Sequence, residues 1–179
     1  AHPTIQSIQV QESAVQSNMV DPNAPYRVLY GVADLSDRLF DYTFRVSPLS
    51  FFQVNRGGCQ VLYDVIRDLA LSVQRPDAPS STLLDLCCGT GTIGICLSAH
   101  FDRVIGIELV PDAIEDARRN AATNGVSDKT EWICGKLEDS LTEDMLKALA
   151  PSVPIAVLDP PRAGAHPSVI KTLRRTESL

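Results

Sequence analysis

The stretch LDLCCGTGTIG, residues 84–94, places a carboxylate just before three closely spaced glycines. Its apolar start predicts a buried strand, and Gly89 and Gly91 predict a sharp turn at which a ligand can approach the backbone. A helix beginning near Thr92 would point its unpaired N–H groups at the same place. The spacing of Gly89, Gly91 and Gly94 also fits the dinucleotide-binding fingerprint, so two classes of cofactor are compatible with this loop.

Asp85 distinguishes the two classes of cofactor. A carboxylate repels the pyrophosphate of a nicotinamide or flavin dinucleotide and attracts the ammonium and sulfonium groups of S-adenosylmethionine. Glu108, nineteen positions after Gly89, stands where a carboxylate hydrogen-bonds ribose hydroxyls in either class. The loop therefore favours S-adenosylmethionine. Two alternatives stay open: a nicotinamide-dependent oxidoreductase, and a tight turn in which Asp85 only caps the helix.

A second candidate stretch is VLDPPRAG, residues 157–164. The two prolines after Asp159 stiffen the backbone and hold its carboxylate in the cleft at the end of a predicted strand. Methyltransferases that act on exocyclic amines of adenine or cytosine carry a related Asp/Asn-Pro-Pro-aromatic run, but Arg162 takes the aromatic position here. The alternative role for Asp159 is that of a turn-forming residue before proline.

A third candidate stretch is SPLSFFQVN, residues 47–55. Adjacent phenylalanines at the start of an amphipathic helix are usually core residues, which is the expectation for Phe51 and Phe52. Gln53 beside them both donates and accepts hydrogen bonds, so it suits an amide, a nucleobase edge or an amino-acid group.

Alternating strands and helices must position these residues. Downstream of a loop near residue 80, strands are predicted at 83–87, 103–108, 130–134 and 155–158, with helices at 92–100, 111–124, 141–149 and 168–175. This alternation predicts an α/β fold with a mostly parallel sheet covered by helices on both faces. Upstream, residues 26–31 and 38–47 alternate like a hairpin around the turn ADLSD, and a helix is predicted at 55–73. We expect residues 1–50 to be an N-terminal β extension or linker from an upstream domain, and residues 51–179 to be the catalytic domain.

Composition limits the possible partners and compartments. No apolar run is long enough to span a membrane, and the five cysteines are an odd number without a Cys-x-x-Cys pair, so we expect reduced thiols, no metal and a cytoplasmic or nuclear protein. The net charge of −6 repels nucleic acid overall, so any RNA must be held by a local patch or by another domain. The basic candidates for such a patch are Arg118, Arg119, Lys171, Arg174 and Arg175.

Five segments of the sequence resemble the uridine C5 RNA methyltransferase family, most closely its eukaryotic tRNA members. They are FRVSPLSFFQVN, LLDLCCGTGTIG, RVIGIEL, AIEDARRNAATNG and LDPPRAGAHPSVI, which cover residues 44 to about 170. The resemblance implies a Rossmann-like class I S-adenosylmethionine-dependent methyltransferase fold with an N-terminal β-hairpin extension. It further implies that the sheet is truncated after about its fourth strand.

The resemblance also implies roles for single residues and a substrate, a uridine of tRNA, in the T-arm. Phe51 would lie against the target base, where an aromatic ring replaces the stacking lost when the base leaves the RNA. Asp159 would border both the base and the methyl donor. Together with Asp85, Gly89 and Gly91 of the loop, the donor site would contain Gln53, Cys87, Thr92, Glu108, Lys136 and Asp159.

The chemistry implied by the resemblance needs two further groups. In this family a cysteine thiolate adds to carbon 6 of uracil, and a glutamate later removes the carbon 5 proton. Both are expected beyond Leu179, so no catalytic residue is assigned within this chain, and the chain by itself is expected to be inactive. Two alternatives stay open beside it: methyl transfer to an exocyclic amine through Asp159, and a non-catalytic module that binds the donor. The oligomeric state is not assigned.

Overall fold

The centre of the structure, a computed structural model that describes residues 4–12, 25–47 and 51–176, is a four-stranded parallel sheet. Its strand order is β7-β6-β5-β8, and every neighbouring pair is parallel. The strands are β5 (Ser81–Leu86), β6 (Arg103–Glu108), β7 (Thr130–Cys134) and β8 (Val153–Leu158). The predicted parallel α/β sheet is therefore confirmed.

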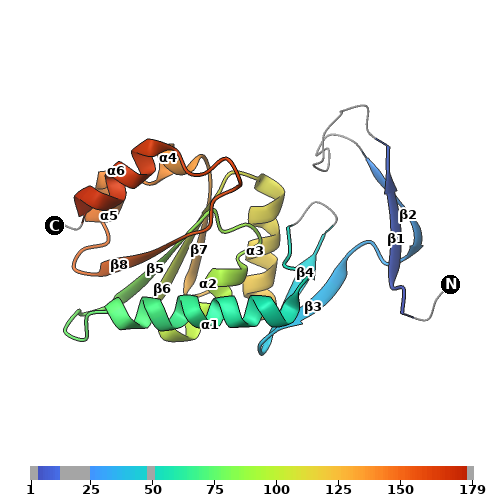
Figure 1. The fold of residues 1–179 in the computed structure, drawn as a ribbon, viewed down its shortest axis with the longest axis horizontal. Helices are drawn as coiled ribbons and strands as arrows, with labels where there is room; N and C mark the ends of the chain where they lie inside the picture. Colours follow the sequence, from blue (N-terminus) through green and yellow to red (C-terminus); the bar gives the residue numbers. More distant parts are fainter. Residues whose placement is uncertain (1–3, 13–24, 48–50, 177–179) are drawn as a thin grey trace.

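Helices cover both faces of this sheet (Figure 1). One face carries α1 (Arg56–Val73), α2 (Thr92–Leu97), which continues into a short 3-10 helix (Ser98–His100), and α3 (Pro111–Thr123). The other face carries α4 (Leu137–Ser140), α5 (Glu143–Lys147) and α6 (Pro167–Thr176). Within the described part of the chain, no helix is both long and apolar enough to cross a membrane.

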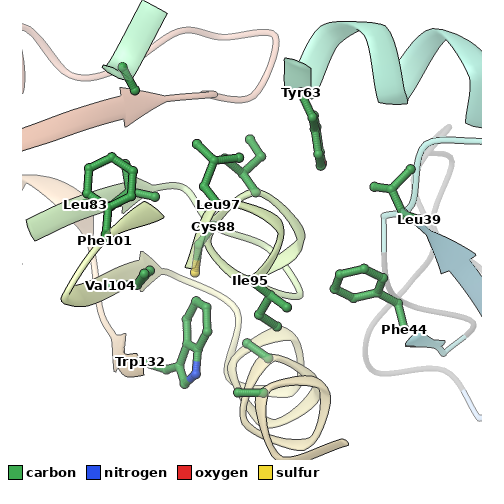
Figure 2. Packing of buried hydrophobic residues seen from close by; sticks show 14 of the residues in the cluster. Leu39, Phe44, Tyr63, Leu83, Cys88, Ile95, Leu97, Phe101, Val104 and Trp132 are labelled. Carbon is green, nitrogen blue, oxygen red and sulfur yellow. The ribbon is translucent and has the colours of Figure 1, made fainter. Parts of the chain in front are cut away.

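Successive residues of β5 supply the two hydrophobic cores. Leu83 packs into the cluster beneath α1, α2 and α3, whereas Leu84 packs into the cluster beneath α4, α5 and α6. This alternation follows from the period of two along a strand, and it requires the continuous apolar run that the sequence has here. Figure 2 shows the first cluster, in which Trp132 of β7 lies near Val104 of β6 and Cys88 of the loop after β5.

Two small antiparallel sheets precede the central sheet. One pairs β1 (Ser7–Gln11) with β2 (Tyr26–Gly31), and the other pairs β3 (Leu35–Leu39) with β4 (Tyr42–Val46). The predicted hairpin between residues 26–31 and 38–47 is therefore wrong. The residues of ADLSD do not form its turn, because the last three of them, residues 35–37, belong to β3 and pair with β4.

Capping residues set the ends of two helices. The side chain of Asn55 accepts a hydrogen bond from the N–H of Gly58 and caps α1, in agreement with the predicted helix at 55–73. The helix predicted at 141–149 is present but shorter, because α5 spans Glu143–Lys147 and Thr142 is its N-cap. The Thr142 hydroxyl accepts a hydrogen bond from the Met145 N–H at 3.1 Å, so α5 begins only at Glu143, after the separate short helix α4.

Candidate functional site

The glycine loop after β5 is held against the next strand. The N–H groups of Cys87 and Cys88 both donate to the carbonyl of Ile107, at 2.9 and 3.1 Å. Gly89 has a φ of +54° and faces open space, since a Cβ there would meet no atom within 4 Å. Gly91 has a φ of +78°, which favours glycine. Packing also requires a glycine there, because a Cβ would lie 2.7 Å from the Trp132 ring. Gly89 therefore leaves room for a ligand, and Gly91 makes room for a tryptophan.

Asp85 is completely buried beneath this loop. Its Oδ2 accepts a hydrogen bond from the N–H of Gly94 at 2.8 Å, so it satisfies one of the free donors at the start of α2. Its Oδ1 is also buried and has no hydrogen-bond partner among the described residues. The helix-capping interpretation thus accounts for one carboxylate oxygen and leaves the other without a partner among the described residues.

Burial raises the pKa of Asp85 to about 7; the Gly94 N–H lowers it, and the charges of Asp159 and Glu108 raise it further. Such a shift means that the ionised form of Asp85 costs free energy in the folded protein, because the carboxylate lies away from water and near like charges. A cation bound near this group of carboxylates would offset part of that cost. The site therefore favours a positively charged ligand.

Glu108 joins the glycine loop to the start of α3. Its Oε2 accepts a hydrogen bond from the Gly89 N–H at 3.1 Å, and its Oε1 accepts from the N–H groups of Leu109 and Val110 at 2.8 and 3.0 Å. The structure thus brings together the glycine loop and the carboxylate that follows the next strand. A carboxylate can accept about four hydrogen bonds, so Glu108 retains capacity for a ribose hydroxyl.

Asp159 reaches the same edge of the sheet from β8. Its N–H donates to the carbonyl of Leu86 at 3.2 Å, and its side chain is exposed. The chain runs from β5 to β6 and β7 on one side and then returns to β8 on the other, so Asp159 and Glu108 flank the end of β5. Parallel sheets bind ligands at such a reversal of strand order.

The cysteine thiols in and around this site are held in their protonated form. Burial raises the pKa of Cys87 to about 11, and the carboxylates of Glu108 and Asp85 raise it further. Burial also raises the pKa values of three other thiols, those of Cys59, Cys88 and Cys96. A nucleophilic cysteine requires the opposite shift. Among the described residues, no group of three His, Cys, Asp or Glu side chains could hold a metal ion.

The two adjacent phenylalanines have different environments. Phe52 packs against Phe44 with ring centroids 6.2 Å apart, in agreement with the core expectation. The same expectation is wrong for Phe51, whose side chain is 75 % exposed. Gln53 is half-buried and Lys136 is exposed just before α4. No hydrogen bond within the described residues joins the side chains of Gln53 or Lys136 to Asp85, Glu108 or Asp159.

Two residues that support the glycine loop were missed by sequence reasoning. The buried Asn120 of α3 donates from Nδ2 to the carbonyl of Thr90 at 3.1 Å. The hydroxyls of Tyr63 and Thr92 are 2.8 Å apart and share a hydrogen bond. An asparagine on the apolar face of the predicted helix was the available signal for Asn120, whereas nothing local in α1 marks Tyr63.

The sheet order, the glycine turn and the carboxylates at the strand ends together define the class I, Rossmann-like methyltransferase fold. Residues 80–170 match the family model described as RNA cap guanine-N2 methyltransferase. Human tRNA (uracil-5-)-methyltransferase homolog A is 46% identical over 87% of this chain and 24% of its own length. The homolog B protein of Danio rerio is 42% identical over 86% of this chain and 31% of its own length.

A solved structure adds to this likeness. The tRNA (uracil-54, C5)-methyltransferase of Pyrococcus abyssi, in complex with S-adenosyl-L-homocysteine, has a TM-score of 0.68 and 28% identity over 96% of this chain and 39% of that protein. The chain belongs to the RNA methyltransferase family that the matching model describes, and the named relatives confirm its resemblance to the uridine C5 RNA methyltransferases. It spans about a quarter to a third of the length of the curated relatives.

Proposed function

We propose that this chain binds S-adenosylmethionine at the carboxyl ends of β5, β6 and β8, as the donor-binding part of an RNA methyltransferase that methylates carbon 5 of a uridine in tRNA. The observation that carries this proposal is the buried Asp85, with one carboxylate oxygen unpaired and two further carboxylates close enough to raise its pKa. The names of the relatives support uracil C5 as the target, and uracil-54 supports a position in the T-arm.

The residues present fit S-adenosylmethionine better than a dinucleotide. Negative charge from Asp85, Glu108 and Asp159 attracts the ammonium and sulfonium groups and repels a pyrophosphate. Glu108 has lone pairs for ribose hydroxyls, and Gly89 leaves space for the donor beside the backbone. By the family resemblance, Gln53, Cys87, Thr92 and Lys136 complete the donor site. When bound, the donor supplies an electrophilic methyl group.

On the substrate side we assign Phe51 and Asp159. The exposed ring of Phe51 suits stacking on a uracil that has left its own stack, and such stacking contributes about 1–3 kcal/mol per base. Asp159 lies at the same edge of the sheet as the donor carboxylates and would contact both ligands. The compartment expected for such an enzyme, cytoplasm or nucleus, stays a prediction.

The cysteines lead us to expect donor binding without methyl transfer by this chain alone. Carbon 5 of uracil becomes nucleophilic only after a thiolate adds to carbon 6. The raised pKa values of Cys59, Cys87, Cys88 and Cys96 disfavour a thiolate at each of these positions.

The test is calorimetric titration of the chain with S-adenosylmethionine, S-adenosylhomocysteine and nicotinamide adenine dinucleotide. Glu108→Gln should weaken donor binding about tenfold, the factor for one hydrogen bond to a charged group. Glu131→Gln is the matched control, because Glu131 is an exposed glutamate on β7 that pairs with Arg103. Preference for the dinucleotide, or equal effects of the two variants, would contradict the proposal.

A second candidate function is methylation of an exocyclic amine through Asp159, Pro160 and Pro161. The description of the matching family model, with guanine N2 as target, favours it. The two candidates are separated by incubating the chain with tritiated donor and tRNA, followed by nucleoside analysis of the digest. Labelled N2-methylguanosine made by this chain would favour the amine reaction, which needs no cysteine, whereas binding without transfer agrees with the uridine proposal.

A further inference from the structure

A pocket lies outside the proposed donor site, at the C-terminal end of α2. Its volume is about 190 Å³, and it is an open pocket between α1, the turn between β3 and β4, and the end of α2 with its 3-10 helix. The residues that line it are Phe40, Tyr42, Tyr63, Asp64, Arg67, Cys96, Leu97, Ala99 and His100.

The size of the pocket suits a single ring system. Its volume of about 190 Å³ equals that of about six water molecules at roughly 30 Å³ each. It lies below the roughly 300 Å³ at which pockets for drug-sized ligands begin. A whole dinucleotide or an S-adenosylmethionine molecule is therefore too large, and one heterocyclic base is of the right order.

The lining combines aromatic faces with a charged edge. Phe40 and Tyr42 contribute rings from the hairpin turn, where Phe40 has a φ of 54° that is unusual for a bulky residue. On α1, the Arg67 guanidinium donates to Oδ1 of Asp64 at 2.6 Å. Arg67 also donates to Asp68, but each terminal nitrogen keeps a further N–H. Rings that stack, a carboxylate that accepts and a guanidinium that donates are the groups that recognise a nucleobase.

The pocket is physically connected to the donor loop. Figure 2 shows Tyr63 projecting from α1 into the space between Leu97 of α2 and Leu39 of β3. The Tyr63 hydroxyl shares a hydrogen bond of 2.8 Å with Thr92, the first residue of α2 and the neighbour of Gly91. A ring bound in the pocket would thus contact a side chain that also holds the start of the donor helix.

We propose that this pocket binds one unpaired RNA base that carries an exocyclic amino group, with Asp64 accepting from the amine and Arg67 donating to a ring nitrogen or carbonyl. Phe40 and Tyr42 stack on the base, and His100 lies at the position of its phosphate. The choice of RNA as ligand rests on the proposed function, whereas recognition of the base rests on the pocket itself. A uracil base has no exocyclic amine, so the pocket is distinct in chemistry from a site for the target uridine.

The test is amide chemical-shift mapping by NMR with cytidine monophosphate and, separately, uridine monophosphate, in the presence of saturating S-adenosylhomocysteine. We expect shifts at Phe40, Tyr42, Arg67 and His100 with the cytidine nucleotide and at least tenfold weaker binding of the uridine nucleotide. Inorganic phosphate serves as a third probe. Equal binding of the two nucleotides, the same shifts with phosphate alone, or no shift at these residues would each overturn the proposal.

Substitutions test whether Arg67 contacts the bound base. Arg67→Ala should weaken binding of cytidine monophosphate about tenfold, because one hydrogen bond to a charged group is lost. Arg75→Ala is the matched control, since Arg75 also pairs with an aspartate, Asp77, but does not line the pocket. Equal losses in the two variants would mean a non-specific charge effect and overturn the assignment.

Two further titrations separate this inference from the proposed function. S-adenosylmethionine alone should shift the amides of Gly89 and Glu108; if it does so while the nucleotide leaves the pocket unchanged, only the pocket proposal fails. If the nucleotide shifts the pocket while the donor leaves Gly89 unchanged, only the proposed function fails. A seven-nucleotide single-stranded RNA containing one cytidine should bind the pocket more tightly than the free nucleotide, and weaker binding would contradict RNA as the source of the base.

Discussion

The two small antiparallel sheets have the same architecture but opposite environments. All six residues of β2 are exposed, including Leu29 at 54 % and Tyr30 at 47 %. The β3–β4 hairpin instead places Leu39 and Phe44, which are 1 % and 0 % exposed, in the core beneath α1, α2 and α3. In Figure 1 the β1–β2 pair lies away from the central sheet, whereas β4 lies beside α3.

Hydrogen bonds from the β3–β4 hairpin to asparagines of α3 and its C-cap explain the difference. The Thr43 N–H donates to Oδ1 of Asn124 and the Arg45 N–H donates to Oδ1 of Asn120, each at 2.8 Å. These two asparagines stand four positions apart and therefore on the same face of the helix. Strand pairing alone does not bring a hairpin into a core. Docking of its free edge and its apolar side chains onto a helix does.

The largest effect on stability is expected in the β3–β4 hairpin, whose core residues are buried. Phe44→Ala should lower the free energy of unfolding by about 3–5 kcal/mol, because the ring is fully buried and leaves a cavity. Urea denaturation monitored by circular dichroism measures this loss in free energy. Phe44→Leu, which keeps most of the volume, should cost less than about 1.5 kcal/mol. Similar losses in the two variants would contradict the packing role given to the ring.

Asn120→Ala should cost about 2–3 kcal/mol, because it leaves the Arg45 N–H and the Thr90 carbonyl without their partner. The same substitution should weaken donor binding, since Thr90 belongs to the glycine loop. Thr123→Ala, at an exposed position of the same helix, is the control for changed helix propensity. If both variants unfold at the same urea concentration, the asparagine does not anchor the hairpin.

Asp85 gives a pH dependence to the stability of the sheet region. Its pKa of about 7 in the folded protein lies above the ordinary 3.8, so the folded state binds the proton more tightly than the unfolded state does. The resulting stabilisation is fully present below about pH 4 and is lost as the pH rises through about 7. Relative to Asp85→Asn, the free energy of unfolding should fall by at most about 1.4 kcal/mol per pH unit in that window.

Urea denaturation of both proteins between pH 4 and pH 8 checks this sign. A difference that stays constant with pH, or that grows in favour of the native protein as the pH rises, would mean that Asp85 is stabilised as a carboxylate. Saturating S-adenosylmethionine should flatten the dependence, because its cationic groups lower the pKa of the carboxylate that they contact.

The smallest effect on stability is expected in the exposed strand β2. Tyr30→Ala should change the free energy of unfolding by about 0.5 kcal/mol or less, because the side chain is 47 % exposed and such substitutions are usually near neutral. Differential scanning calorimetry of the native chain and the variant provides the measurement. A loss comparable with that of Phe44→Ala would mean that β2 is packed in solution, and the comparison of the two small sheets would no longer hold.

The central sheet and its helices were predictable because their signals are local. The apolar runs of β5 and β6 and the helical periodicity of α1 and α3 each lie within one segment, and Asn55 marks the start of α1. The pairing of the hairpin strands was not predictable in the same way. Alternation identifies a strand, but its place in the fold depends on residues far along the chain, as the hydrogen bonds of β4 to Asn120 and Asn124 show.

The sequence by itself determined the parallel α/β fold, the glycine turn and the carboxylates at the strand ends, because a residue's place along a strand fixes the edge at which it lies. Only the tertiary structure decided the state of those groups. The burial of Asp85 with one unpaired oxygen, the exposure of Phe51 beside a packed Phe52, and the contact of Tyr63 with Thr92 all depend on elements that are distant in sequence. Solvation and packing belong to the assembled surface rather than to any single segment, so no local pattern encodes them.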